Sequence, residues 1–339
     1  MILASLRNRV FARLFAAQAV SLLGDALTWV GLALVAFRLA GTGAPAVLGV
    51  TLTLRVLAFV LLSPLAGAVA DRVDRKLVLV ACDLSRAVVI ALVAFVTSEW
   101  QLYALVFVLN AFTAFFTPVN QATVPLVTSR EEAGAAFALS SAATEVVGIA
   151  GPGLAGLLAA AVGWQALFLM DGASFLASGL VILSLPGRLR VPRENREPGT
   201  TLAGVRDGTA RLWRDPRSRF ALLMELVAAV AGALVLVNTV ERVKGGLGLG
   251  DAPFGLVMAV YGAGATLASL AVGAAGRKVP RARFILLGAV LTTLAVLPAD
   301  FAGFAVLLPL WWLAGVGQNW VNLPTLALLA ERTPEQAQG

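Results

Sequence analysis

Ten apolar runs, each long enough to form a helix across a lipid bilayer, constrain this chain more than any other feature. A spanning helix needs about 20 predominantly apolar residues, because lipid offers the backbone N–H and C=O groups no hydrogen-bond partners outside the helix. The sequence therefore predicts an all-α transmembrane protein with spans at 11–39, 46–70, 76–97, 101–124, 135–161, 165–186, 219–241, 252–275, 283–299 and 302–329.

Composition supports lipid as the main solvent. Hydrophobic residues make up 59% of the chain and charged residues only 13%, with a mean hydropathy of +0.87, whereas soluble domains are about 25% charged. The net charge of +7 is spread over short segments between apolar runs, so we expect contact with a lipid surface and none with nucleic acid. With Cys82 as the single cysteine and no histidine, we expect no metal site, no cofactor and no enzyme activity.

The basic residues also predict orientation. If the N-terminus is cytoplasmic, most of the 26 Lys and Arg residues fall in cytoplasmic segments, as the positive-inside rule requires. We therefore expect a multi-pass membrane protein with its N-terminus in the cytoplasm. A bacterial plasma membrane and a monomeric state are further expectations, which do not depend on this count.

An internal repeat divides the chain. A shift of 206 positions aligns Arg13 with Arg219, the basic turn at 72–76 with that at 277–283, and Pro118 with Pro324. This register predicts two homologous, pseudo-symmetric helical bundles. We assign 1–187 to a six-helix bundle, 188–217 to a basic cytoplasmic linker, and 218–339 to a second bundle with four helices, so that about 10 of 12 helices are present.

The turn between the second and third spans carries the most specific motif. It contains Gly67, Asp71, Arg72, Arg75 and Lys76, and its basic residues alone could serve as a positive-inside anchor. The pattern resembles the signature G-x-x-x-D-R-x-x-R-K of the major facilitator superfamily. The resemblance implies a secondary transporter that works by alternating access, in which this turn acts as a conformational latch.

A second motif lies in the fifth span, at Gly148, Gly151, Pro152 and Gly156. Its glycine spacing formally matches a dinucleotide-binding fingerprint, but no strand precedes it. Small residues on one face allow close helix packing, and proline allows a bend. The run also resembles the antiporter motif of family members that export drugs, which implies export; generic helix packing is the alternative.

Over the rest of the chain the resemblance is to bacterial exporters of the enterobactin and macrolide-efflux type. It implies a small hydrophobic organic substrate, of drug or siderophore type, and coupling to protons or sodium. The chain has no G-x-x-x-x-G-K-[ST] loop for ATP. The alternative from another class is a truncated, transport-inactive membrane protein or binding scaffold, since two helices of the repeat have no counterpart.

Ionisable residues inside spans are costly and mark functional sites. At about 1.5 Å rise per residue, Asp25, Arg55 and Glu145 fall near one plane in the middle of the membrane. We expect Asp25 or Glu145 to exchange a proton while Arg55 biases that exchange; a static buried ion pair is the alternative. Asp83 and Arg86 are one turn apart and are expected to pair within their helix.

Two further acidic residues, Asp171 and Glu225, are expected near helix ends, where solvation would explain them. Polar and aromatic side chains of the fourth and tenth spans are candidates for the substrate cavity of the resembled fold: Asn110, Phe116, Asn120, Asn319 and Asn322. Lipid-facing aromatic residues are the alternative for this mixture.

Overall fold

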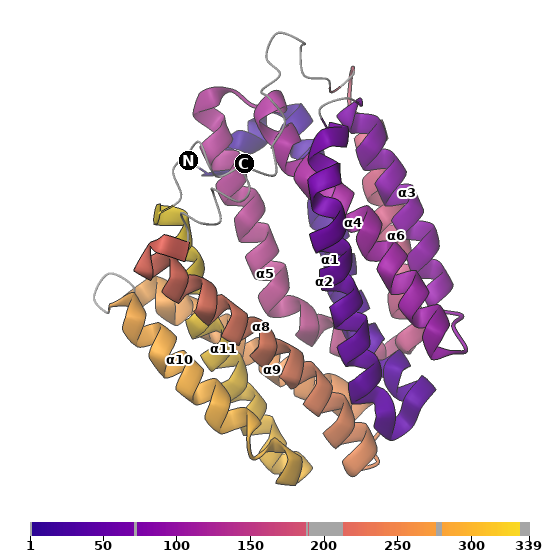
Figure 1. Cartoon of the computed structure of the whole chain (residues 1–339), viewed down its shortest axis with the longest axis vertical. Coiled ribbons are helices and arrows are strands. Elements are labelled where there is room, and N and C mark those ends of the chain that lie inside the picture. Colours follow the sequence, from indigo (N-terminus) through magenta and orange to yellow (C-terminus); the bar gives the residue numbers. More distant parts are fainter. Residues whose placement is uncertain (1, 71–72, 188, 190–212, 276–279, 333–339) are drawn as a thin grey trace. The chain divides into compact units, whose positions relative to one another are not determined.

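Helices account for nearly all of the chain that the structure describes. The computed structural model describes residues 2–70, 73–187, 189, 213–275 and 280–332, and no strand occurs among them. The helices (Figure 1) are α1 (Arg9–Ala40), α2 (Ala44–Ala70), α3 (Arg75–Val93), α4 (Glu99–Val127), α5 (Arg130–Val162), α6 (Trp164–Leu183), α8 (Pro216–Val240), α9 (Asp251–Ala275), α10 (Arg281–Val296) and α11 (Phe304–Arg332). The predicted all-helical fold is confirmed, and each predicted span coincides with one of these helices.

Eight helical segments among the described residues are long and apolar enough to cross a membrane. One of them, Arg9–Ser63, runs through α1 into α2, so the eight segments cover nine helices. The exception is α3, which carries four charged residues within 19. The sequence-based span at 76–97 is therefore helical, but its composition does not qualify it as an independent membrane span.

The chain forms two compact units. The first contains residues 1–31, 46–147 and 164–201, and the second contains residues 32–45, 148–163 and 202–339. The helices recur at the predicted offset: α3 and α10 begin 206 residues apart, and α4 and α11 begin 205 apart. In each unit the two members of the pair pack on each other, α3 on α4 and α10 on α11. The repeat therefore extends from the sequence to the helix pattern.

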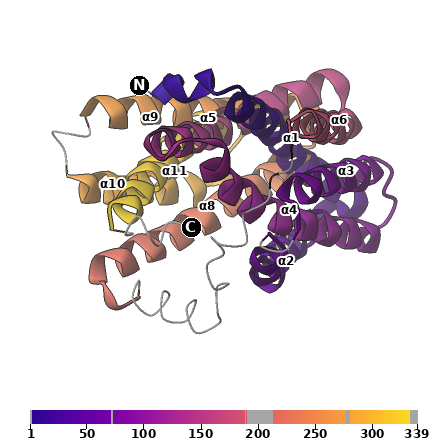
Figure 2. The same ribbon diagram turned by 90° about the horizontal axis from the view of Figure 1, so that it is seen from above.

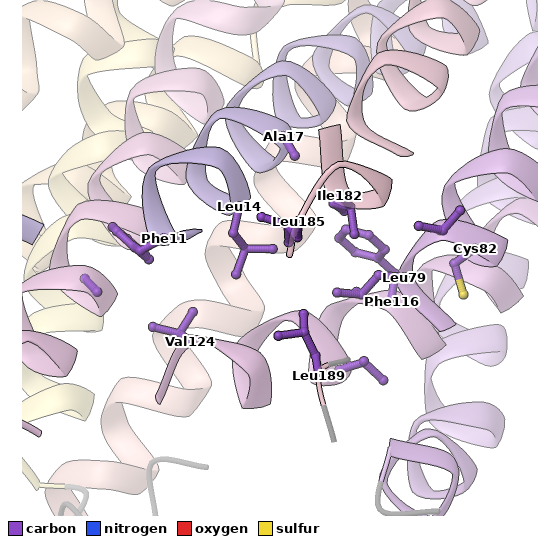
Figure 3. Close-up of a cluster of buried hydrophobic side chains, with 13 residues drawn as sticks. Phe11, Leu14, Ala17, Leu79, Cys82, Phe116, Val124, Ile182, Leu185 and Leu189 are labelled. Atoms are coloured by element: carbon purple, nitrogen blue, oxygen red, sulfur yellow. The ribbon is translucent and has the colours of Figure 1, made fainter. Parts of the chain in front are cut away.

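The core of the first unit lies where α1, α3, α4 and α6 meet. Figure 1 shows α3 beside α4 and α6, and Figure 3 shows side chains from all four helices converging. The cluster includes Phe11, Leu79, Phe116 and Ile182, which are between 0% and 7% exposed. Since lipid is as apolar as these side chains, the cluster is held by close packing rather than by exclusion of water.

The second unit is held together by close helix crossings. Figure 2 shows α10 beside α11, and at this crossing a Cβ on Gly317 would lie 2.6 Å from the carbonyl oxygen of Gly288. Two side chains of α11 reach other helices: the Trp311 indole donates to the Thr239 hydroxyl, and the Gln318 amide donates to the Ala228 carbonyl at 2.6 Å. Small residues thus allow contact, and polar side chains fix its register.

Candidate functional site

A buried ion pair occupies the middle of α3. Arg86 pairs with Asp83 one turn earlier, and their side chains are 2% and 0% exposed. The other Asp83 oxygen accepts a hydrogen bond from Ser178 of α6 at 2.7 Å. The guanidinium lies over two aromatic rings, 4.1 Å from the centroid of Phe116 and 4.2 Å from that of Phe175. A cation over an aromatic ring is stabilised without water, which explains how this charge is tolerated in an apolar bundle.

Asp171, on α6, is fully buried. Its carboxyl group accepts a hydrogen bond from the Thr28 hydroxyl of α1, and Ser174 Oγ lies 3.1 Å from Oδ1. Gly24 makes this approach possible, since a Cβ there would collide with Ser174 and with the carboxyl group of Asp171. The expectation that solvent surrounds Asp171 is therefore wrong. The packing of α1 on α6 that buries it gave no local signal in the sequence.

Asp25 lies within electrostatic range of Asp171. It is half-buried on α1, and it makes no hydrogen bond or ion pair with a described side chain. Arg86 and Arg55 are the cations that act on it electrostatically. The Arg55 guanidinium lies 4.3 Å from the ring centroid of Trp29. Exchange of a proton at Asp25 stays a prediction.

The third coupling candidate, Glu145, is half-buried on α5. It belongs to the same unit as Asp25, and its role stays a prediction. Three charged residues that were not among the coupling candidates interact electrostatically with Asp25: Asp83, Arg86 and Asp171.

The second half of the internal repeat has no ionisable residues at the positions of three of these charges. At an offset of 206 residues, the counterparts of Asp25, Asp83 and Arg86 in the second unit are Ala231, Ala289 and Thr292. These three residues line a cavity of about 140 Å³ between α8, α10 and α11. The second unit therefore packs these helices without ionisable side chains at the three positions.

The signature turn is described only in its second half. Asp71 and Arg72 lie outside the described residues, and of Gly67 only the helical backbone of α2 is described. Arg75 donates a hydrogen bond to the Ala122 carbonyl of α4, and Lys76 donates to the Leu185 carbonyl beyond α6 at 2.6 Å.

Asp74, which the sequence analysis did not single out, caps the N-terminus of α3. Its carboxylate accepts from the backbone N–H of Lys76 at 3.0 Å and from that of Leu189 at 3.2 Å. Together with Arg75 and Lys76 it ties α3 to α4 and to the chain that leaves α6.

The glycine motif of α5 packs against α9 within the second unit. A Cβ on Gly156 would lie 2.7 Å from the carbonyl oxygen of Gly255, and one on Gly153 would lie 3.1 Å from Cα of Ala259. Gly151 is buried and Pro152 half-buried, whereas a Cβ on Gly148 would meet no atom within 4 Å. Close packing at Gly156 agrees with the expected small-residue face, whereas Gly148 is not part of that face and Gly153 is.

The candidate cavity residues fall into two groups. Two amide groups are used for helix structure: Asn110 donates to the Val106 carbonyl of its own helix at 2.8 Å, and Asn319 donates to the Ala265 carbonyl of α9 at 2.6 Å. The other two asparagines keep unused polar atoms.

Asn120 and Asn322 each have a buried Oδ1 with no hydrogen-bond partner among the residues that the structure describes. Because an unsatisfied buried acceptor is costly, these two atoms are the better candidates for contact with a ligand. Phe116 faces the Arg86 guanidinium instead.

Comparisons with known proteins agree with this architecture. The chain is 26% identical over 335 residues to the uncharacterized MFS-type transporter YfiS of Bacillus subtilis (strain 168), an alignment that covers 96% of this chain and 80% of YfiS. It is 28% identical over 221 residues to macrolide efflux protein A of Streptococcus pyogenes, with 63% of this chain and 53% of that protein covered.

A solved structure shows the same fold. The crystal structure of a bacterial homologue of the human lysosomal transporter Spinster, inward-facing and unoccupied, matches with a TM-score of 0.70 at 14% identity, covering 95% of this chain and 74% of the other. The family model described as Major Facilitator Superfamily matches residues 14–243. Because that match extends over more than half of the sequence, the chain belongs to the Major Facilitator Superfamily of membrane transporters.

Proposed function

We propose that this protein exports small hydrophobic organic molecules from a bacterial cell in exchange for protons, by alternating access in the plasma membrane. The relatives named for efflux support the direction of transport. The observation that carries the proposal is the unpaired carboxylate of Asp25, which lies in the middle of α1 with two guanidinium groups in electrostatic range.

Proton coupling follows from the chemistry of that position. Burial favours the neutral form of a carboxyl group, while a nearby guanidinium favours the ionised form. A change in the distance between Asp25 and Arg55 or Arg86 would therefore bind or release a proton. Arg55, stacked on Trp29, is the cation that such a movement would bring closer or withdraw.

The substrate class follows from the side chains available on α4 and α11. In the first unit the amide oxygen of Asn120 on α4 is free to accept a hydrogen bond from a ligand, and in the second unit that of Asn322 on α11 is free to do the same among the described residues. Both helices are otherwise mostly apolar in sequence, and ligand sites are mostly apolar with a few polar groups that fix orientation. An apolar helix with such an acceptor suits a hydrophobic organic molecule that carries a hydrogen-bond donor, and macrolides and lipophilic dyes are suitable probes.

Transport by inside-out vesicles tests the proposal. An acidic lumen should drive uptake of ethidium or radiolabelled erythromycin, and nigericin should abolish that uptake. Asp25→Asn should remove the stimulation by the pH gradient at an unchanged expression level, whereas Asp25→Glu should retain part of it. Glu99→Gln, at an exposed position on α4, is the matched control.

Each other outcome contradicts part of the proposal. Uptake that follows a sodium gradient would overturn proton coupling. Gradient-driven uptake at the wild-type rate in Asp25→Asn would remove Asp25 from the mechanism. Failure of the unaltered chain to move either probe would overturn export and favour a binding or inactive role.

Orientation is part of the same proposal. In a Cys82→Ser background, a cysteine placed at the exposed Arg7 should react with a membrane-impermeant maleimide in inside-out vesicles and remain protected in intact cells. Labelling in intact cells would place the N-terminus outside.

A further inference from the structure

The hydroxyl group of Ser174 lies near two oxygen atoms of Asp171. Ser174 Oγ lies 2.8 Å from the backbone carbonyl oxygen of Asp171 and 3.1 Å from its Oδ1. A hydroxyl group has one proton to donate, and a carbonyl oxygen can only accept. If the Ser174 proton goes to the carbonyl, the second contact is a full hydrogen bond only when Oδ1 of Asp171 carries a proton and donates it to Ser174.

The charges around Asp171 agree with a neutral carboxyl group. From α1 it faces the hydroxyl of Thr28 and the like charge of Asp25, and from α3 it is acted on by Arg86. The direct salt bridge of Arg86 goes to Asp83. Asp171 therefore has no cation in contact with it among the described residues, and an unpaired charge in a buried apolar position is strongly disfavoured.

One N–H group of Arg86, at Nε, makes no hydrogen bond with the described residues. The residue is only 1% exposed. Leaving such a donor unsatisfied costs free energy, and a carboxylate that forms nearby would satisfy it. Asp83 is already paired through another nitrogen of the guanidinium, so this N–H is available to a second anion in the cluster.

We propose that Asp171 is a second proton-binding site, and that Asp171 and Asp25 hold one proton between them. In one state Asp171 is a carboxylic acid that donates to Ser174, and Asp25 is ionised. In the other the proton has left Oδ1 of Asp171 for the carboxylate of Asp25, and the new Asp171 anion accepts from Thr28 and Ser174. One O–H bond breaks and one forms, so the net charge of the cluster does not change. The role in transport rests on the proposed function, whereas the protonation of Asp171 does not.

Infrared spectroscopy of the purified full chain in lipid tests the protonation directly. A buried carboxylic acid gives a C=O stretching band, separate from carboxylate bands, that shifts on exchange into D₂O. We expect this band at neutral pH in the unaltered protein, and its loss in Asp171→Asn. The asparagine variant keeps an acceptor for Thr28 and a similar size, so the fold should persist; an unchanged thermal midpoint checks this. Glu99→Gln is the control and should leave the band unchanged.

The Asp25→Asn variant tests the sharing. Removing the like charge should allow Asp171 to ionise at lower pH, so the pH at which half the band is lost should decrease. If Asp171→Asn keeps the band of the unaltered protein, the proposal is wrong. If Asp25→Asn leaves the titration of the band unchanged, the two residues do not share a proton.

These results are separable from transport. A band that behaves as expected in a chain that shows no proton-driven uptake would retain the Asp171 site and overturn the proposed function. Normal proton-driven uptake in the unaltered chain without such a band would retain the proposed function and overturn the Asp171 site.

Discussion

The Arg86 guanidinium and the Asp83 carboxylate pair within one turn of α3, and both side chains are withdrawn from solvent. Phe116 and Phe175 lie against the guanidinium, so neither charge has water to replace its partner.

Removal of one partner should therefore cost much more than removal of both. Asp83→Asn leaves the Arg86 charge buried and unpaired, for which we expect a loss of about 3–5 kcal/mol in the free energy of unfolding. The double variant Asp83→Asn with Arg86→Met should recover most of that loss, because no buried charge remains. Unfolding in detergent, followed by circular dichroism, measures both. Losses that simply add in the double variant would contradict a direct pair.

The close contact of α5 with α9 predicts a sharp difference between two glycines. Gly156→Ala places a Cβ 2.7 Å from the Gly255 carbonyl oxygen, so the helices must separate, at a cost of about 1–3 kcal/mol. Gly148→Ala is the matched control: its Cβ meets no atom within 4 Å, and alanine is the better helix former by about 1 kcal/mol. Thermal midpoints should fall for the first variant only. Equal midpoints would show that this crossing is not tightly packed.

Two asparagines of α11 should separate stability from substrate affinity. Asn319→Ala removes the hydrogen bond to Ala265 of α9, for which we expect a loss of about 0.6 kcal/mol and at most about 1.7 kcal/mol. Asn322→Ala removes an oxygen with no partner, so stability should hold while the apparent KM for the probe rises. The free energy of unfolding and the apparent KM, measured on the same preparations, check this assignment. A stability loss in Asn322→Ala with a raised KM in Asn319→Ala would contradict it.

The capping residue of α3 gives a further prediction. Asp74→Ala removes an acceptor from the first turn of the helix and from Leu189, and helix caps contribute about 1 kcal/mol. We expect faster hydrogen exchange at the backbone amides of Lys76 and Leu189 together. Val73→Ala, at the exposed preceding position, is the control and should leave both exchange rates unchanged. Unchanged rates in Asp74→Ala would show that the cap is not formed.

The fold could be predicted from the sequence because lipid imposes a simple rule on the backbone. Apolar runs have to become helices there, so each predicted span coincides with an observed helix, and the 206-residue register recurs in the helix starts of α3 and α10. Helix ends differ by a few residues because polar caps such as Asp74 decide them.

The candidate site was predictable only where local sequence carries the signal. Asp83 and Arg86 are three residues apart, so their pairing follows from helix geometry. Asp171 meets Thr28 and Gly24 across 143 residues or more of chain, and no spacing rule connects them. The distance of Asp171 from the helix end does not predict its burial, because burial depends on which helices pack against the side of α6.

The three side chains at the start of α3 also limit how the first unit can move. Asp74, Arg75 and Lys76 bind backbone groups on α4 and on the segment after α6, so the same ends of three helices are fastened at one point. A rearrangement that opens one side of the membrane can bend these helices further along, but it has to carry this corner as a single block.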